Sequence, residues 1–189
     1  MIIEEIKTMK LQGEIISLRA IEPEDIDLLY RWENDTEAWV VSNTQTPFSY
    51  FVLEQYIASA HQDIYAAKQL RLMIDIPNAD PLNLIKTETI GCIDLFDFDP
   101  NHLRAGVGIL IAAKSNRKKG YASEALSILI KYCFHSLNLN QLFCNIAVDN
   151  KSSILLFQKY GFEVVGTKKQ WIRSGTNFKD ELLLQKIRI

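Results

Sequence analysis

Hydrophobic and polar positions follow two different periods along this chain, and together the two periods predict an α/β fold. The clearest helical stretch comes after Gly120, where apolar residues recur every three or four positions. These residues are Ala122, Ala125, Leu126, Leu129, Ile130, Cys133, Phe134 and Leu137. A stripe of this kind predicts a helix that packs one face against a sheet.

Strands are predicted where short apolar runs lie between turn-forming residues. The runs are Ile15 to Arg19, Leu70 to Ile76, Thr87 to Phe98, Ala105 to Ile111 and Leu142 to Val148, followed by a hairpin of Val164 to Ile172 with Glu181 to Ile187 around Ser174-Gly175. Pro77 to Asn83 is rich in Pro, Asn and Asp and predicts a turn. The three middle runs from Leu70 to Ile111 therefore predict an antiparallel meander.

Other helices are predicted from Pro23, from about Ser49, and from the N-cap Asn150 to Tyr160. The segment from Trp32 to Phe48 has mixed polarity and predicts a loop. The resulting order, β-α-α-β-β-β-α-β-α-β-β, predicts one domain over residues 1–189. Its fold class is a mixed α/β sheet flanked by helices.

Composition narrows the possible partners and the compartment. The 189 residues carry 21 Lys and Arg against 23 Asp and Glu, so the overall basic field that nucleic-acid binding usually needs is missing. Cys92, Cys133 and Cys144 lie apart in apolar runs, which favours reduced core thiols. No uncharged stretch approaches the ~18 residues of a membrane span. We therefore expect a cytoplasmic protein that binds neither nucleic acid nor membrane.

Histidine chemistry and metal binding are not expected. His61, His102 and His135 lie far apart in unrelated predicted elements, so neither a catalytic triad nor a metal site can be argued from them.

The stretch from Arg117 to Ala122, Arg-Lys-Lys-Gly-Tyr-Ala, stands between a predicted strand and the longest helix. A helix that starts after a glycine turn leaves several backbone N–H groups unpaired at its first turn. These groups, the helix dipole and the charges of Arg117, Lys118 and Lys119 all favour an anion such as a diphosphate.

Two blocks of sequence carry a resemblance to a known family. Arg117 to Ala122 is similar to the Arg/Gln-x-x-Gly-x-Gly/Ala turn of the GNAT superfamily of acetyl-CoA-dependent N-acetyltransferases, and Ser123 continues as the helix of that turn usually does. The second block, Asn150 to Phe162, matches the Asn-x-x-Ser…Lys-x-Gly-Phe stretch of the same superfamily. The resemblance runs from about Ile15 to Gln185 and implies a GNAT-type fold, with a mostly antiparallel sheet and one splayed strand pair.

The resemblance also implies which residues bind acetyl-CoA. Backbone amides of the turn would hold the diphosphate, and the strand Ile109-Leu110-Ile111 would run beside the pantetheine arm, with Leu110 or Ile111 donating to the thioester oxygen. The expected coenzyme-binding residues are Ile109, Leu110, Ile111, Arg117, Lys118, Lys119, Gly120, Tyr121, Ala122, Ser123, Asn150, Ser152, Ser153 and Phe157. No metal is implied.

The resemblance breaks at Phe157. Polyamine-acetylating relatives usually carry a tyrosine seven residues after the motif asparagine, taken to protonate the departing thiolate, and counting from Asn150 gives Phe157. Phenylalanine has no proton to donate. Tyr160 shares a helix face with position 157 and is the candidate catalytic residue, with a structural tyrosine beside Gly161 as the competing interpretation.

The region Trp32 to Asp35, the strand Ile109 to Ile111 and the terminal hairpin look most like the branch of bacterial spermidine N-acetyltransferases and ribosomal-protein N-terminal acetyltransferases. The resemblance therefore implies a primary amine acceptor, and related polyamine enzymes often form homo-oligomers. The seven carboxylates between Glu22 and Glu37 slightly favour a polyamine. A protein N-terminus is the alternative.

Two acidic regions supply the candidate general bases and acceptor-binding carboxylates, and tryptophans could contact an ammonium group. We expect Glu33, Trp39 and Asp94 to contact the acceptor, and the wider set is Trp32, Asp35, Glu37, Asp97 and Asp99. For each charge a solvated surface position is the competing interpretation. Two further hypotheses remain open: a non-catalytic acetyl-CoA-binding protein, suggested by Phe157, and an unrelated α/β domain that binds another phosphate ligand.

Overall fold

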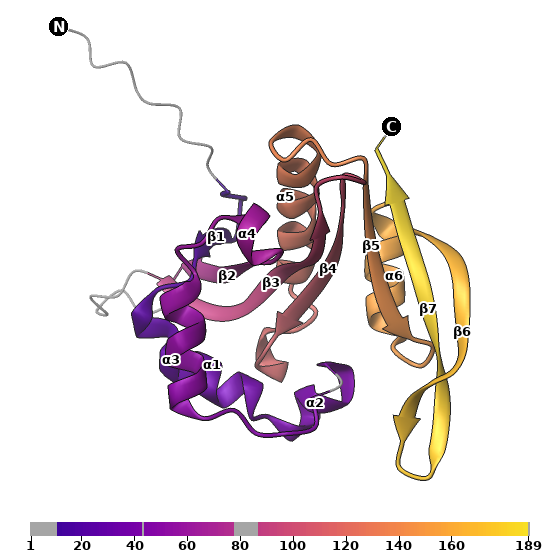
Figure 1. The fold of residues 1–189 in the computed structure, drawn as a ribbon, viewed down its shortest axis with the longest axis horizontal. Helices are drawn as coiled ribbons and strands as arrows, with labels where there is room; N and C mark the ends of the chain where they lie inside the picture. The colour runs from indigo at the N-terminus through magenta and orange to yellow at the C-terminus, as the bar shows by residue number, and fades with distance from the viewer. Residues whose placement is uncertain (1–10, 43, 78–86, 189) are drawn as a thin grey trace, which may run out of the picture.

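The computed structural model describes residues 11–42, 44–77 and 87–188, which form a seven-stranded sheet with helices on both faces (Figure 1). The strands are β1 Ser17–Ala20, β2 Leu70–Pro77, β3 Thr87–Asp99, β4 Arg104–Ile111, β5 Gln141–Ala147, β6 Glu163–Ser174 and β7 Asn177–Ile187. Their order is β1-β2-β3-β4-β5-β7-β6, and every neighbouring pair is antiparallel except β4 and β5. The mixed, mostly antiparallel fold predicted from the sequence is confirmed.

The helices follow the predicted stripes and caps. They are α1 Ile26–Glu33, α2 Thr36–Ser42, α3 Tyr50–Ser59, α4 Ile64–Ala67, α5 Tyr121–His135 and α6 Lys151–Lys159, with short 3-10 turns η1 Pro23–Asp25 and η2 Lys114–Asn116. Ser49 caps α3, and Asn150 caps α6 by accepting a bond from the Ser153 N–H. Gly161 has the left-handed backbone, φ 78°, that ends a helix.

The loop predicted from Trp32 to Phe48 is only partly a loop, because Thr36–Ser42 forms α2. The short helix α4, which follows the cap Asp63, was also not predicted. Neither α2 nor α4 has the long periodic row of apolar residues that indicates a core helix. The predicted turn Pro77 to Asn83 falls mainly outside the described residues, and only Pro77, at the end of β2, can be placed.

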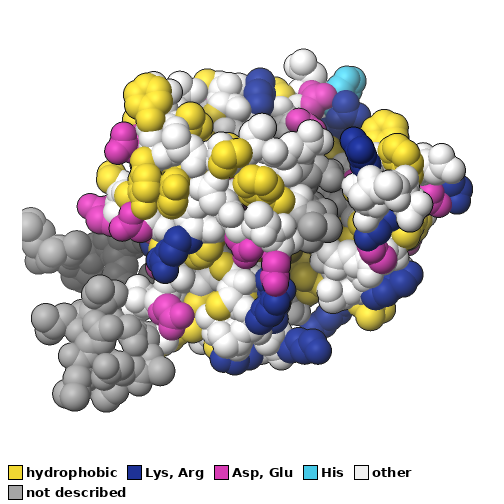
Figure 2. All heavy atoms as spheres, turned by 90° about the horizontal axis from the view of Figure 1, so that it is seen from below, with side chains coloured by type: hydrophobic (Ala, Val, Ile, Leu, Met, Phe, Trp, Pro, Cys, Tyr) yellow, Lys and Arg dark blue, Asp and Glu magenta, His cyan; other side chains and the backbone are white. Residues whose placement is uncertain are grey.

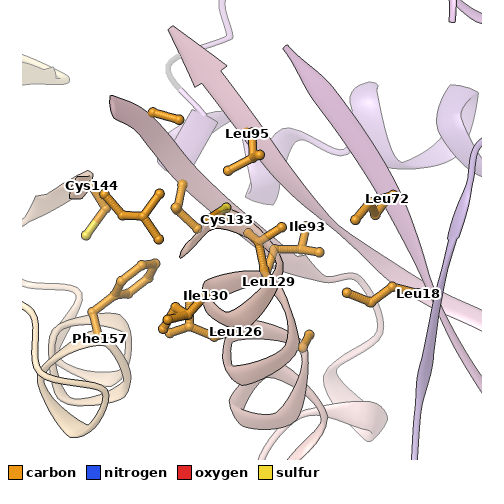
Figure 3. Close-up of a cluster of buried hydrophobic side chains, with 14 of the residues drawn as sticks. Leu18, Leu72, Ile93, Leu95, Leu126, Leu129, Ile130, Cys133, Cys144 and Phe157 are labelled. Atoms are coloured by element: carbon orange, nitrogen blue, oxygen red, sulfur yellow. The ribbon is translucent and has the colours of Figure 1, made fainter. Parts of the chain in front are cut away.

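Each face of the sheet has its own helices and its own core. On one face α5 and α6 cover the larger cluster, in which Leu126 and Phe157 meet Ile93 and Cys144 (Figure 3). On the other face α1 and α3 bury a smaller cluster that includes Leu29, Leu53, Met73 and Cys92. We call this second side the α1 face.

Strands β4 and β5 pair only at their first residues. Arg104, Ala105 and Gly106 pair with Gln141, Leu142 and Phe143, although both strands continue well beyond these pairs. Figure 1 shows the two strands moving apart toward the end where β4 leads into η2. The splayed pair is therefore present, at the place where the sequence predicts it.

Candidate active site

The free edge of β4 provides the backbone groups of the candidate site. The Ala112 N–H donates to the Ile90 carbonyl, 3.0 Å, and Cys92 stands opposite Leu110 in the register. Because facing residues in an antiparallel pair alternate between bonded and non-bonded, Leu110 directs its backbone groups toward β3. Ile109 and Ile111 then direct theirs toward the space between β4 and β5. Of the two predicted oxyanion donors, the geometry favours Ile111.

The turn before α5 has the backbone shape that an anion cradle needs. Lys118 and Gly120 both have left-handed backbones, φ 61° and 91°, so the chain doubles back just before the helix. The Glu124 N–H makes the first helical bond, to the Gly120 carbonyl at 3.0 Å. The N–H groups of Tyr121, Ala122 and Ser123 precede that bond and point out of the helix start. Their binding of an anion stays a prediction.

Arg117 and Lys119, two of the three basic residues of this turn, make different contacts. The Arg117 guanidinium donates to the carbonyls of Ile111 at 3.1 Å and Ala112 at 3.0 Å, so it holds the turn against the end of β4. The Lys119 Nζ lies 3.5 Å from the Asn116 Oδ1. Figure 2 shows the molecule from below relative to Figure 1. Lysine and arginine side chains are numerous on this face, mostly in the lower and right-hand parts of Figure 2.

The second predicted block forms the start and the body of α6. The Asn150 side chain accepts from the Ser153 N–H at 3.2 Å and from the Ser152 hydroxyl at 3.1 Å. These bonds fix the first turn of α6, which lies by β5 on the same face of the sheet as α5 (Figure 1). Asn150 and Ser152 therefore have a structural role that is independent of any coenzyme.

Phe157 is a core residue. Its side chain is 3% exposed, and its ring meets the ring of Phe162 edge to face at 5.0 Å. Figure 3 shows it pointing from α6 toward Leu126 and Ile130 of α5. A hydroxyl added here would have to find a partner among apolar neighbours.

Tyr160 reaches from the end of α6 to the first turn of α5. Its hydroxyl lies 2.9 Å from the Ser123 Oγ, which also accepts from the Lys159 Nζ at 3.0 Å. The Lys159 ammonium stands 5.5 Å from the centre of the Tyr160 ring. The catalytic candidate is thus linked to the coenzyme turn through Ser123, and its catalytic role stays a prediction.

On the α1 face, Glu33 and Asp94 share one arginine. The Arg71 guanidinium binds both oxygens of Asp94, at 2.8 and 2.9 Å, and reaches Glu33 at 2.6 Å. It also stands 5.6 Å from the centre of the Tyr56 ring. Burial opposes the charge of Arg71, but the charge and hydrogen bonds of Asp94 together with Cys92 and Tyr56 outweigh it and raise the pKa of Arg71 well above its ordinary value. The two predicted carboxylates are therefore brought together, with a net charge of about −1 for the three groups.

Arg71 was not predicted as a site residue, although a signal for it existed. It is the only charge between Leu70 and Ile74 in a strand that is otherwise apolar there. A buried arginine requires a partner on the same face, and the register places Asp94 directly opposite.

Helix α2 lies between the acceptor-side residues and the coenzyme turn. The Trp39 indole N–H donates to the Glu33 carbonyl at 2.6 Å, which anchors α2 to the end of α1. Glu37 pairs with Lys114 of η2 at 2.8 Å, and both side chains are mostly exposed. Asp35 caps α2 through the Glu37 N–H. Trp39 is therefore a structural anchor beside Glu33, and its contact with an acceptor stays a prediction.

A hollow of about 570 Å³ lies on the α1 face where β4 and β5 still pair. Its lining includes Asp97, Asp99, Arg104 and Phe143, and Asp99 pairs with Arg104 at 3.2 Å. A smaller hollow of about 230 Å³ lies beside Arg71 and Asp94. Phe143 lines the larger hollow and Phe96 lines the smaller one. The two rings meet edge to face, with their centres 5.8 Å apart.

Gly106 of β4 lies directly beneath the Phe96 ring, which lines the smaller hollow. A Cβ on Gly106 would lie 2.3 Å from the Phe96 ring, so only glycine lets this ring lie on β4. Across the gap, Lys168 links Asn145 of β5, at 2.7 Å, to the buried Glu181 of β7, at 2.9 Å. The pair of Lys168 with the buried Glu181 was not predicted from the sequence.

The remaining reactive side chains lie in the core or at the surface. Burial raises the pKa values of Cys133 and Cys144 to about 12 and moves the pKa of Cys92 upward as well. His61 and His135 each place a ring nitrogen on a carbonyl one turn earlier. Within the described ranges, no group of three or more His, Cys, Asp or Glu side chains is arranged to hold a metal ion. In the same ranges, no helix combines the length and the apolar character needed to cross a bilayer.

Comparisons with known proteins agree with this geometry. Residues 16–163 match the family described as the acetyltransferase (GNAT) domain. An uncharacterized N-acetyltransferase p20 of Bacillus licheniformis is 30% identical over 168 residues, which cover 85% of this chain and 86% of the relative. The spermidine N(1)-acetyltransferase of Escherichia coli (strain K12) is 25% identical over 154 residues, covering 80% and 74%.

Among solved structures, the spermidine N-acetyltransferase of Vibrio cholerae, crystallised with CoA and spermine, has a TM-score of 0.80 to this chain. The match covers 93% of this chain and 96% of the other at 20% identity, and it shows a shared fold. With the family match over most of its length and a relative at 30% identity, this chain belongs to the GNAT family and is an acetyl-CoA-dependent N-acetyltransferase.

Proposed function

We propose that this enzyme transfers the acetyl group of acetyl-CoA to a primary amine, with a polyamine of the spermidine kind as the favoured acceptor. The observation that carries the proposal is the parting of β4 from β5 beside a basic turn with left-handed backbones at Lys118 and Gly120. A parted strand pair offers unused backbone groups to an extended ligand, and the turn offers amides to an anion. Pantetheine joined to a diphosphate matches both.

The proposal assigns the coenzyme to two sets of residues. The amides from Gly120 to Ser123 hold the diphosphate, with Lys118 and Lys119 adding charge and Arg117 bracing the turn. The backbone of Ile109 and Ile111 pairs with the pantetheine amides as a neighbouring strand would, and Leu110 holds β4 in register. On the far side of the gap, the first turn of α6 with Asn150, Ser152 and Ser153, and the α6 side chain Phe157, support the other flank of the arm.

The reaction needs few additional groups. The amine nitrogen attacks the thioester carbonyl and forms the C–N bond, the C–S bond breaks as the thiolate departs, and the proton lost by the nitrogen passes to solvent. A backbone N–H of Ile111 or Ile109 would stabilise the oxyanion. We assign protonation of the thiolate to Tyr160, whose hydroxyl is next to the Lys159 ammonium through Ser123. A thiol of pKa about 8.5 is a fairly good leaving group, so the phenylalanine at 157 is tolerated.

The acceptor side supports an amine. Glu33 and Asp94 with Arg71 carry a net charge of about −1, which suits one ammonium group, and Trp39 is fixed beside Glu33. The Escherichia coli relative acts on spermidine according to its name, and this is the support for a polyamine.

A protein N-terminus is the second candidate. Most acidic groups of the early helices are paired with cations or hydrogen-bond donors of the protein itself. The acceptor side is therefore less acidic than the sequence suggests, which favours this second candidate. Asp25 pairs with Arg19, Glu33 with Arg71 and Glu37 with Lys114. A neutral α-amine on a peptide needs fewer free carboxylates than a polycation does.

One experiment tests both candidates. Release of CoA is followed with spermidine, with a monoamine of similar length and with peptides that begin as ribosomal proteins do. Turnover on spermidine far above the peptides supports the polyamine proposal, and inertness toward spermidine together with turnover on peptides contradicts it. Glu33→Gln should raise the KM for spermidine several-fold, whereas Glu54→Gln on α3 should leave it unchanged.

The terminal hairpin supports self-association. Val165, Trp171 and Phe178 on β6 and β7 are each more than half exposed, at 53%, 63% and 57%. Large apolar side chains exposed along one hairpin suit a protein interface. We therefore include a homo-oligomer in the proposal, and light scattering of the wild type against Trp171→Ser tests it.

A further inference from the structure

The inference concerns Glu124, the first acidic residue of α5. A carboxylate in the first turn of a helix normally sits near the helix N-terminus and favours it electrostatically. At this helix, however, the N-terminus is the proposed anion cradle, so a free carboxylate would compete with the diphosphate for the same positive potential. The structure shows where this charge goes instead.

The Glu124 carboxylate is captured by three consecutive backbone N–H groups from the start of the chain. Its Oε1 accepts from Glu14 at 2.6 Å, and its Oε2 accepts from Ile15 and Ile16, both at 3.0 Å. Three amides around one carboxylate form an anion-binding concavity of the kind usually occupied by a ligand. Here the occupant is a side chain of the coenzyme helix.

The segment that supplies these amides is a closed loop. The Leu18 N–H bonds to the Leu11 carbonyl at 2.7 Å, and the Gly13 N–H bonds to the Ile16 carbonyl at 2.9 Å. We call residues 11–18 the capture loop. Because the loop is held by its own bonds and by Ile16 in the core, its three amides are set before Glu124 arrives.

The fit between the capture loop and Glu124 depends on a glycine. A Cβ on Gly13 would lie 2.3 Å from the Glu124 Cδ and 2.4 Å from its Oε1. The carboxylate is the end of a flexible side chain, so a methyl group at position 13 would displace it from the loop without forcing the backbone. On the other flank, Ile15 Cδ1 lies 3.6 Å from the Cβ position of Gly120. The loop therefore contacts the anion turn itself.

We propose that the capture loop withdraws the charge of Glu124 from the anion cradle, while the loop itself is fixed against Gly120. The proposal rests on the proposed function, because it takes the diphosphate of CoA as the ligand of that turn. It predicts that the loop matters for coenzyme affinity mainly while residue 124 carries a charge.

Four variants and CoA itself as the probe test this proposal by calorimetry. Gly13→Ala frees the Glu124 carboxylate and should raise the Kd for CoA about fivefold, the effect of one misplaced charge at a helix end. Glu124→Gln removes that charge and should change the Kd less than about twofold. The double variant Gly13→Ala/Glu124→Gln should regain nearly the wild-type Kd. Gly166→Ala, where a methyl group meets nothing closer than 4.0 Å, is the matched control.

Three further readouts separate charge placement from simple loosening of the fold. The Gly13→Ala effect should shrink as ionic strength rises, and it should appear in the KM for acetyl-CoA and not in kcat at saturating coenzyme. In Glu124→Gln, hydrogen exchange at Glu14 to Ile16 should become faster.

A Gly13→Ala Kd equal to that of the wild type overturns the proposal, as does an equal loss with and without the Glu124 charge. If the wild type gives no heat with CoA, the proposed coenzyme site fails instead, and the two failures are thus distinguishable.

Discussion

At the scale of single residues, the site depends on charges that the protein itself neutralises. The Arg71 guanidinium pairs with both Glu33 and Asp94. The Lys168 ammonium pairs with Glu181 and also donates to the Asn145 side chain. A sequence lists the carboxylates but not their partners, because partners come from strand register and from helix ends far along the chain. For this reason Glu33 and Asp94 could be predicted as neighbours of the site, whereas Arg71 could not.

Replacing Arg71 with methionine tests how much its pairing stabilises the fold. Arg71→Met leaves Glu33 and Asp94 partly buried beside one another without a cation, and removing one partner of such a group should lower the free energy of unfolding by about 3 kcal/mol. Urea unfolding measures this. Arg104→Met is the control, since Arg104 is about half exposed and its pair with Asp99 should contribute less than about 1 kcal/mol. Equal losses in both variants would contradict the assignment.

Position 157 gives a second prediction at this scale. Phe157→Tyr introduces a hydroxyl among Leu126, Ile130 and Phe162, where an unpaired polar group should lower stability by about 1–3 kcal/mol. The rate of CoA release should not rise. Thermal unfolding and steady-state kinetics on the same preparation measure both effects, and a large gain in rate would mean that this position faces the leaving sulfur.

At the scale of elements, the long periodic stretches could be predicted and the short ones could not. The stripe from Ala122 to Phe134 gives α5, and the caps at Ser49 and Asn150 give α3 and α6. Helix α2 escaped prediction because its stability comes from contacts outside its own sequence, namely Trp39 with Glu33 and Glu37 with Lys114. Tertiary contacts of this kind leave no period in the chain.

The cap of α6 gives a prediction for one element. Asn150→Ala removes the acceptor of the Ser153 N–H and should lower the free energy of unfolding by about 1 kcal/mol, whereas Asn150→Ser should keep most of it. Chemical denaturation of the three proteins measures the difference. Ser152→Ala, which loses only a hydroxyl that donates to Asn150, serves as control. Identical stability of Asn150→Ala and the wild type would contradict the capping role.

At the scale of the whole molecule, ion pairs with buried carboxylates join β1, η1 and β2 into one unit. Arg19 binds Asp25 with two nitrogens, at 2.7 and 2.8 Å, and Asp75 with a third at 2.8 Å. Asp25 also accepts from the Glu22 N–H. Burial works against ionisation of Asp25, but these bonds outweigh it and lower the pKa of Asp25.

A lowered pKa fixes the sign of the pH dependence. The Asp25 carboxylate contributes stability above its unfolded pKa of about 3.9, and this contribution is lost as pH falls further, through the lower folded pKa. The free energy of unfolding should therefore drop as the pH falls below about 4 in the wild type and drop less in Asp25→Asn. Glu24→Gln, at an exposed neighbour, should follow the wild type. Parallel profiles for Asp25→Asn and the wild type would contradict this account.

The short pairing of β4 with β5 has a thermodynamic consequence. Three residue pairs join the two halves of the sheet, and one hydrophobic cluster lies beneath both halves. Beyond these pairs the edge of β4 is not paired with β5 in the folded chain, so a ligand that enters displaces water without breaking strand pairing. Association then needs no conformational opening, and the melting temperature should climb with the logarithm of ligand concentration once the dissociation constant is exceeded.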